Sequence, residues 1–224
     1  MHARHGSRHS ESSPQPSGLH GSPRVVNYSR STVHTGRMSL RLPVVLSEHD
    51  LPLPELLAAR LDGEVFRIDD AFAPLDEIEG PAHRARAILA RAPSRFIAEQ
   101  HSAAWVWGAL QLPPVKHEYC VDIGARVSGS PARRHRVREV VIDANDIATL
   151  GGFSVTTRLR TAVDLARFSQ HFDEGEDQAT RRLIADGGFT VDELVDELNR
   201  RRNLPNKRLA TDRVLGLTRA SIRC

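Results

Sequence analysis

The chain has 224 residues, of which 40% are hydrophobic and 26% charged, so it has the composition of a globular protein with a normal core. No run approaches the roughly 18 apolar residues of a membrane span, and the N-terminus lacks the apolar core of a signal peptide. The two cysteines, Cys120 and Cys224, exclude a disulfide framework, so we expect a cytoplasmic protein.

The positive net charge of the chain comes from its first 37 residues. They hold five arginines against one glutamate, so the remaining residues sum to −1 within the total of +3. The segment is rich in Ser, Gly, His and Pro and cannot bury enough apolar surface to offset the entropy of ordering it. We therefore expect residues 1–37 to be a disordered tail. Met38 is the expected start of translation, and a genuine disordered arm is the alternative.

Residues 50–80 are acidic, with nine Asp or Glu against two Arg. Leucines between positions 56 and 61 predict a short helix that ends at Gly63, and "EVFRI" predicts a short strand. Pro81 begins a predicted helix that runs to about residue 90. DNA binding requires Lys or Arg against phosphates, so the acidic segment would repel DNA.

The stretch "HSAAWVWGAL" predicts a buried helix with Ser102 as its N-cap and Gly108 near its end. Trp105 and Trp107 point about 200° apart on such a helix, so they cannot both face one narrow core. Either the helix lies between two layers, or one indole is exposed and binds a partner.

Three strands are predicted next. In "VKHEYCVDI", residues 115–123, apolar and polar positions alternate as in a half-buried strand. The alternation sends His117 and Cys120 to opposite faces, so we expect a core histidine and not a metal ligand. "VREVVI" and "LGGFSVT" are the other two strands. Their short connections predict antiparallel pairing, and so an α+β fold with a small antiparallel sheet packed with several helices.

The stretch "SVTTRLRTAVDLAR", residues 154–167, predicts a helix capped by Thr157. Its apolar residues repeat at helical spacing and form one buried stripe. Arg160, Asp164 and Arg167 share another face. They are expected to form a solvent-exposed ladder of ion pairs, each contributing about 0.2–0.5 kcal/mol, although a further partner for Asp164 is an alternative.

Two more helices are predicted. The first runs from about Glu174 to Ala185 and stops at Gly187-Gly188, and the second begins with a capping box of Thr190 and Glu193. Two basic clusters are candidate surfaces for a protein partner or nucleic acid: Arg133, Arg134, Arg136 and Arg138, and then Arg200, Arg201, Arg202, Lys207 and Arg208. Arginines at a helix C-terminus also complement its dipole, which is the simpler interpretation of the second cluster.

Catalysis has no support in the sequence. The chain has no Gly-rich phosphate loop, no Cys/His metal spacing and no nucleophile elbow. We therefore expect a protein that is not an enzyme, with no catalytic residues, no cofactor and no metal.

Taken in order, "AEQHSAAWVWGAL", "HEYCVDI", "GFSVTTRLRTAVDLAR" and "RRRNLPNKR" make the chain resemble the AbiEi-type antitoxin family over about residues 95–215. In that family a "SAAxxxGL" helix precedes an antiparallel sheet and a "TxxRTxxDLAR" helix. The positions that carry the resemblance, expected to have an architectural role, are Ser102, Trp105, Gly108, Thr157, Arg160, Thr161 and Asp164.

This resemblance implies an actinobacterial antitoxin of a type IV toxin–antitoxin (abortive infection) system that counteracts a nucleotidyltransferase-type toxin. The two proteins need not form a stable complex, and an orphan antitoxin is the other form that the resemblance allows. The alternative is a DNA-binding regulator of its own operon. Family members usually begin with a promoter-binding winged helix, and residues 38–94 are expected to be a shortened or degenerate form of it. Some relatives continue into a nuclease-like domain, for which this chain ends too early. Three segments are thus expected: 1–37, 38–94 and the antitoxin domain 95–224.

Overall fold

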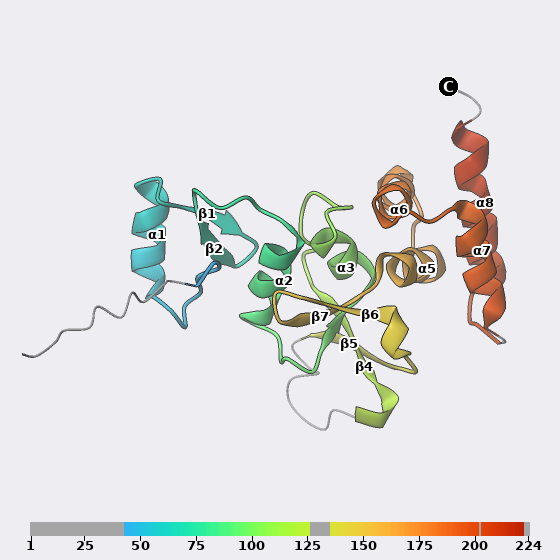
Figure 1. Cartoon of the computed structure of the whole chain (residues 1–224), viewed down its shortest axis with the longest axis horizontal. Helices are drawn as coiled ribbons and strands as arrows, with labels where there is room; N and C mark the ends of the chain where they lie inside the picture. The colour runs from blue at the N-terminus through green and yellow to red at the C-terminus, as the bar shows by residue number, and fades with distance from the viewer. Residues whose placement is uncertain (1–42, 126–134, 202, 222–224) are drawn as a thin grey trace, which may run out of the picture. The chain divides into compact units, whose positions relative to one another are not determined.

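The computed structural model describes residues 43–125, 135–201 and 203–221, so the expected tail at 1–37 lies outside the described residues. The described chain confirms the α+β class (Figure 1). Its helices are α1 (Leu53–Leu61), α2 (Pro81–Leu89), α3 (Gln100–Val106), α5 (Arg158–Phe168), α6 (Glu174–Gly187), α7 (Val191–Arg200) and α8 (Lys207–Ser221), with short 3-10 turns η1 (Ile123–Ala125) and η2 (Ala144–Asp146). Its strands are β1 (Val65–Ile68), β2 (Ala71–Pro74), β3 (Ile97–Ala98), β4 (Glu118–Asp122), β5 (Arg136–Val140), β6 (Ile147–Leu150) and β7 (Phe153–Thr156).

The N-terminal part consists of α1 beside an antiparallel hairpin of β1 and β2. Prolines at 52 and 54 fix the start of α1, and Gly63 follows its end with a φ of 75°. The predicted short helix, its glycine stop and the first strand are therefore confirmed. Strand β2 was not predicted, because "AFAP" is buried at three consecutive positions and shows no alternation.

The main sheet has five strands in the order β5-β4-β3-β7-β6. Pairs β3–β4 and β6–β7 are antiparallel, whereas β3–β7 and β4–β5 are parallel. The prediction of antiparallel pairing between the first two predicted strands was thus wrong. The connection at 123–135 is long enough to return the chain to the start of β4, which a parallel pair requires.

Strand β4 is shorter than the predicted strand and is covered on both faces. Val115 is fully exposed, while Tyr119 and Val121 face one apolar cluster and Cys120 faces another. The alternation in 115–123 therefore reflects two different buried faces over five residues. It does not reflect one buried and one solvated face.

The stretch "LGGFSVT" contains the last residue of β6, a turn and the whole of β7, whereas a single strand was predicted. Gly151 and Gly152 have φ values of 56° and 86° and connect β6 to β7 as a two-residue hairpin turn. Two consecutive positive φ values are typical of a type I′ turn, where glycine is the least strained residue. The Gly-Gly pair was a hairpin signal that the strand prediction overlooked.

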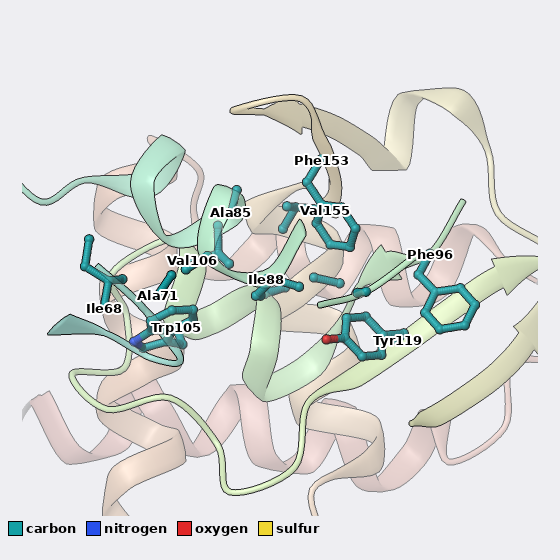
Figure 2. Close-up of a cluster of buried hydrophobic side chains, with 14 of the residues drawn as sticks. Ile68, Ala71, Ala85, Ile88, Phe96, Trp105, Val106, Tyr119, Phe153 and Val155 are labelled. Carbon is teal, nitrogen blue, oxygen red and sulfur yellow. The ribbon is translucent and has the colours of Figure 1, made fainter. Parts of the chain in front are cut away.

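Helix α3 lies between two apolar cores. Trp105 and Val106 belong to the first core, with α2 and the main sheet, as Figure 2 shows. Ala104 belongs to the second core, with α5 to α8, and the partly buried Trp107 contacts both. The indole of Trp107 donates to the carbonyl of Thr156 at 2.7 Å. The prediction of a helix between two layers is therefore confirmed.

The second core is built by the C-terminal helices. Thr157 caps α5, Asp173 and Glu176 form a capping box on α6, and Thr190 and Glu193 form another on α7. The predicted caps at 157 and 190 are confirmed, as is the end of α6 at left-handed Gly188. Helix α8, which was not predicted, completes this core with Ala210 and Val214. No helix in the described ranges is long and apolar enough to span a membrane.

We expect replacement of Gly151 by Ala to destabilise the fold more than replacement of Gly188. Both residues are left-handed, so each alanine has the same backbone cost of about 1–2 kcal/mol. A Cβ at 151 would also overlap the carbonyl oxygen of Ala82 in α2, whereas nothing lies within 4 Å of a Cβ at 188. Urea unfolding of G151A and G188A measures the difference. Equal losses of unfolding free energy in G151A and G188A would contradict the packing of the hairpin turn on α2.

Candidate functional site

The family-like helix α5 holds a buried carboxylate between two guanidinium groups. Asp164 has no exposed surface. Its Oδ2 accepts from Nε of Arg160 at 2.9 Å, and its Oδ1 accepts from Nη1 of Arg167 at 3.1 Å. Arg160 and Arg167 are themselves only 5% and 6% exposed. Because a buried charge is costly without partners, each group depends on the others.

The two arginines extend this network to other elements. Arg160 donates to Oδ2 of Asp146 in η2 at 2.7 Å, and Arg201, at the end of α7, pairs with the same carboxylate. Arg167 donates to the carbonyl of Pro205 at 3.0 Å, between α7 and α8. We call Asp146, Asp164, Arg160, Arg167 and Arg201 the α5 ion network.

The prediction of a solvent-exposed ladder on α5 was wrong. All residues from Arg160 to Arg167 are buried, because η2 and the α7–α8 connection cover the face that carries the charges. The alternative prediction, a further partner for Asp164, agrees better with the structure, in which Asp164 pairs with both Arg160 and Arg167. Burial by itself lowers the pKa of Arg160, but the charges and hydrogen bonds of Asp164 and Asp146 outweigh it and raise that pKa.

The hydroxyl groups of Thr161 in α5 and Ser102 in α3 connect these two helices to neighbouring strands. Thr161 Oγ1 lies 2.8 Å from the carbonyl of Thr157 and 2.8 Å from Oγ1 of Thr156, which ties α5 to β7. Ser102 was predicted to be the N-cap of α3, but this prediction was wrong, because Glu99 holds that position. Within the helix, Ser102 Oγ accepts from the amide of Glu118 at 2.8 Å and contacts Nδ1 of His117.

A second group of buried charges lies where β3 meets α3. Glu99, 1% exposed, receives two hydrogen bonds from Arg138 of β5 at 2.7 and 2.6 Å. The guanidinium of Arg138 lies 4.0 Å from the ring centre of Phe168, and that of Arg167 lies 4.3 Å from the same ring. Phe168 is thus contacted by cations of both groups, which favours cation–π attraction.

His101 connects two carboxylates beside this group. Its Nδ1 lies 2.9 Å from Glu118 and its Nε2 lies 3.2 Å from Glu176 of α6. The hydrogen bond with Glu118 raises the pKa of His101 above its ordinary 6.5, although burial opposes it. Burial works to raise the pKa of Glu118, but the bonds and charge of His101, with Arg136, lower it overall.

Two small cavities of about 250 and 150 Å³ adjoin these residues and share Gln100, Glu118, Arg136 and Phe168. Gln100 has a φ of 49°, which is strained for a residue other than glycine. Glu99, Glu118 and Glu176 each contact a cation or histidine at this place. They therefore act as acceptors in fixed pairs, an arrangement suited to holding elements together.

The sequence prediction missed Glu99, Gln100, His101 and Asp146. The acidic residues had no motif around them, and the pairing of Glu99 with Arg138 crosses 39 positions. Among the residues that the structure describes, no group of three or more His, Cys, Asp or Glu is arranged to hold a metal ion. Burial raises the pKa of the Cys120 thiol strongly, and Glu99 adds to this effect, so the thiolate form is disfavoured.

The predicted basic clusters are divided by the structure. Arg133, Arg134 and Arg202 lie outside the described residues. Arg138 and Arg201 are engaged in the two charge groups, and Lys207 donates to the carbonyl of Asn199. Arg136 and Arg200 pair with Glu118 and Glu197, but their side chains are 63% and 62% exposed. Arg208 is also exposed.

A sequence model of the AbiEi antitoxin C-terminal domain matches residues 96–209, just over half of the chain. The match begins before β3, ends in the first turn of α8 and contains both charge groups. No curated protein matches the chain. Among solved structures, the crystal structure of the RV2827C protein from Mycobacterium tuberculosis is 19% identical with a TM-score of 0.32, over 78% of this chain and 75% of that one.

We expect D164N to lower the free energy of unfolding by about 3 kcal/mol or more, because it leaves two buried guanidinium groups without their shared anion. The matched control is D177N in α6. That residue also pairs with an arginine four positions later, but the pair is about one third exposed, so its loss should cost about 1 kcal/mol or less. Urea unfolding measures both. Similar losses would show that the buried network does not stabilise the fold.

We expect His101 to make stability fall as the pH rises above 6.5. Since folding raises the pKa of His101, its protonated form contributes fully below the ordinary value of 6.5, and the contribution is lost as the pH passes the raised value. H101Q should remove this component from unfolding curves recorded between pH 5.5 and 8.5. H171Q, which changes an exposed histidine of the same cavity, should retain it. A pH profile unchanged by H101Q would contradict the assignment.

Proposed function

The chain belongs to the AbiEi antitoxin family, and from that premise we propose that it is the antitoxin of a type IV system and counteracts a nucleotidyltransferase-type toxin. The match of the antitoxin domain over residues 96–209 is the observation that supports this proposal. Membership in the family already implies a role in a toxin–antitoxin system and a toxin as partner. The class of toxin and the existence of a toxin gene next to this one are the steps that we add.

We place the activity in residues 95–224 and assign the α5 ion network to architecture. The contacts of Thr157, Thr161 and Asp164 support this assignment, since each joins α5 to itself or to a neighbouring element. The first core also contains Ala85 and Ile88 of α2, which precede this segment. Experiments on function should therefore use the full chain, which keeps that core complete.

The exposed members of the second basic cluster are the best candidates for a working surface. Arg201 belongs to the α5 ion network, so its replacement would change stability as well as charge. Arg200 and Arg208 are exposed and lie outside the network. A positive patch of this kind can steer encounter with an acidic partner or with the RNA on which a nucleotidyltransferase acts.

The alternative of a DNA-binding regulator has no comparable support. Residues 43–80, where the family usually has a winged helix, hold ten acidic and two basic residues. Of the basic clusters, the described arginines at 136, 138, 200 and 201 each pair with a carboxylate. The pairs of Arg138 and Arg201, whose side chains are only 29% and 22% exposed, would have to open for specific phosphate contacts, which leaves the exposed arginines for non-specific ones. We therefore expect any DNA binding by this chain to be non-specific.

Growth rescue tests the proposed function. A nucleotidyltransferase gene next to this one is co-expressed with the full chain, with R200Q/R208Q and with the control R60Q/R95Q, which removes two exposed arginines outside the family match. We expect the full chain and the control to restore growth and R200Q/R208Q to restore it less. D164N should fail through low soluble yield, because its defect is in folding.

The outcomes separate the parts of the proposal. If the neighbouring gene is toxic and the full chain gives no rescue, the antitoxin proposal is wrong for this chain. If R200Q/R208Q rescues as well as the control does, the antitoxin proposal stands but the surface is elsewhere. Repression of the chain's own promoter without any toxin, measured with a reporter, would favour the regulator instead.

A further inference from the structure

Helix α1 leaves part of its apolar surface exposed. Leu56 is fully buried, but Leu53, Leu57 and Leu61 are 41%, 42% and 88% exposed. These three leucines repeat every four residues and so lie along one side of the helix. Exposed Pro54 and Ala58 continue the same apolar side. Three of the four leucines of α1 are thus exposed by 41% or more, although α1 lies beside the β1–β2 hairpin (Figure 1).

Two further exposed apolar residues lie in the segment that follows β2. The amide of Leu75 donates to the carbonyl of Glu64 at 2.9 Å, directly after the turn that ends α1. Leu75 is 63% exposed and Ile78 is 87% exposed. We call Leu53, Leu57, Leu61 and Leu75 the α1 apolar patch. A cluster of exposed large apolar residues bordered by polar ones is typical of an interaction site.

The border of the patch is acidic. Residues 43–80 hold ten Asp or Glu against Arg60 and Arg67. In the described part of the chain, no cation lies within ion-pair distance of the exposed carboxylates of Glu55, Asp62 and Glu64. These charges are therefore free to attract a cationic partner, whereas other exposed acids of this chain, such as Asp70, already have one.

We propose that the α1 apolar patch is a docking surface for a basic amphipathic helix of another protein. The exposed leucines fit the apolar side of such a helix, and the acidic border fits its Lys and Arg residues. A second copy of this chain would bring like charges together, and nucleic acid would be repelled. The patch lies outside residues 96–209, so this inference goes beyond the proposed function and does not depend on it.

The first experiment measures binding of a defined probe. A fluorescein-labelled helical peptide with leucines on one side and lysines on the other is titrated with the full chain, and anisotropy is recorded. We expect L53S/L57S/L61S to weaken binding at least about tenfold, since each leucine loses its apolar contact. L112S/V141S, which changes two exposed apolar residues elsewhere, should bind like the unaltered chain. Thermal unfolding confirms that all variants are folded.

Charge is tested separately from apolar contact. E55Q/D62N/E64Q should weaken binding of the lysine peptide and reduce its dependence on salt. D192N/D196N removes two exposed carboxylates from α7 and should change neither. A control peptide with glutamates in place of the lysines should not bind. The proposal is overturned if the leucine variant binds normally, if the two charge variants behave alike, or if the glutamate peptide binds equally well.

A second experiment asks whether something else already covers the patch. L57C is introduced into the full chain with Cys224 replaced by Ser, so that the buried Cys120 is the remaining native thiol. Rapid maleimide labelling at every protein concentration is the expected result. Labelling that slows as the concentration rises would assign the patch to a second copy. Slow labelling at all concentrations would assign it to the chain's own residues 1–42. Either result overturns the proposal.

Discussion

The buried carboxylate of Asp164 is the group on which the C-terminal half of the molecule depends. An ionised carboxylate without solvent needs partners, and both of its oxygens are occupied by guanidinium groups from the same helix. Each guanidinium then reaches a different element: Arg160 reaches η2 before the hairpin of the sheet, and Arg167 reaches the connection between α7 and α8. One side chain on α5 thereby fixes the sheet and the last two helices relative to that helix.

The network accounts for why the motif requires these residue types. Arginine presents several donors in a rigid plane, so one guanidinium can bind Asp164 and still donate to a second acceptor, which the single ammonium of lysine does less well. Aspartate is short enough to stay within α5 between positions 160 and 167. Thr157 caps the helix and Thr161 ties it to β7. The contacts thus support an architectural role for the segment that identifies the family, and functional groups must be sought on the surface that this framework holds.

The sequence was sufficient to predict the elements whose position depends on neighbouring residues. The caps at Thr157 and Thr190, the glycine stops at 63 and 188 and the position of α3 between two layers were predicted, because each is set by neighbouring residues or by helical period. The parallel pairing of β4 with β5 was not, since pairing is decided by partners distant in the chain. The same limit applies to the charges. A helix that carries Arg160, Asp164 and Arg167 on one side has the pattern of a solvated helix. Only the approach of η2 and Pro205 turns that side into the interior.

The distribution of charge also bears on what the molecule can bind. An arginine-rich sequence suggests nucleic acid, but Arg138, Arg160, Arg167 and Arg201 are engaged with the chain's own carboxylates or carbonyl groups. The charges that remain exposed include two groups of opposite sign. Residues 43–80 are acidic with exposed leucines, and Arg200 and Arg208 are exposed arginines within the residues that the family model matches. The two proposed surfaces would therefore attract partners of opposite charge, because a cationic partner is repelled by arginines and an acidic partner by carboxylates.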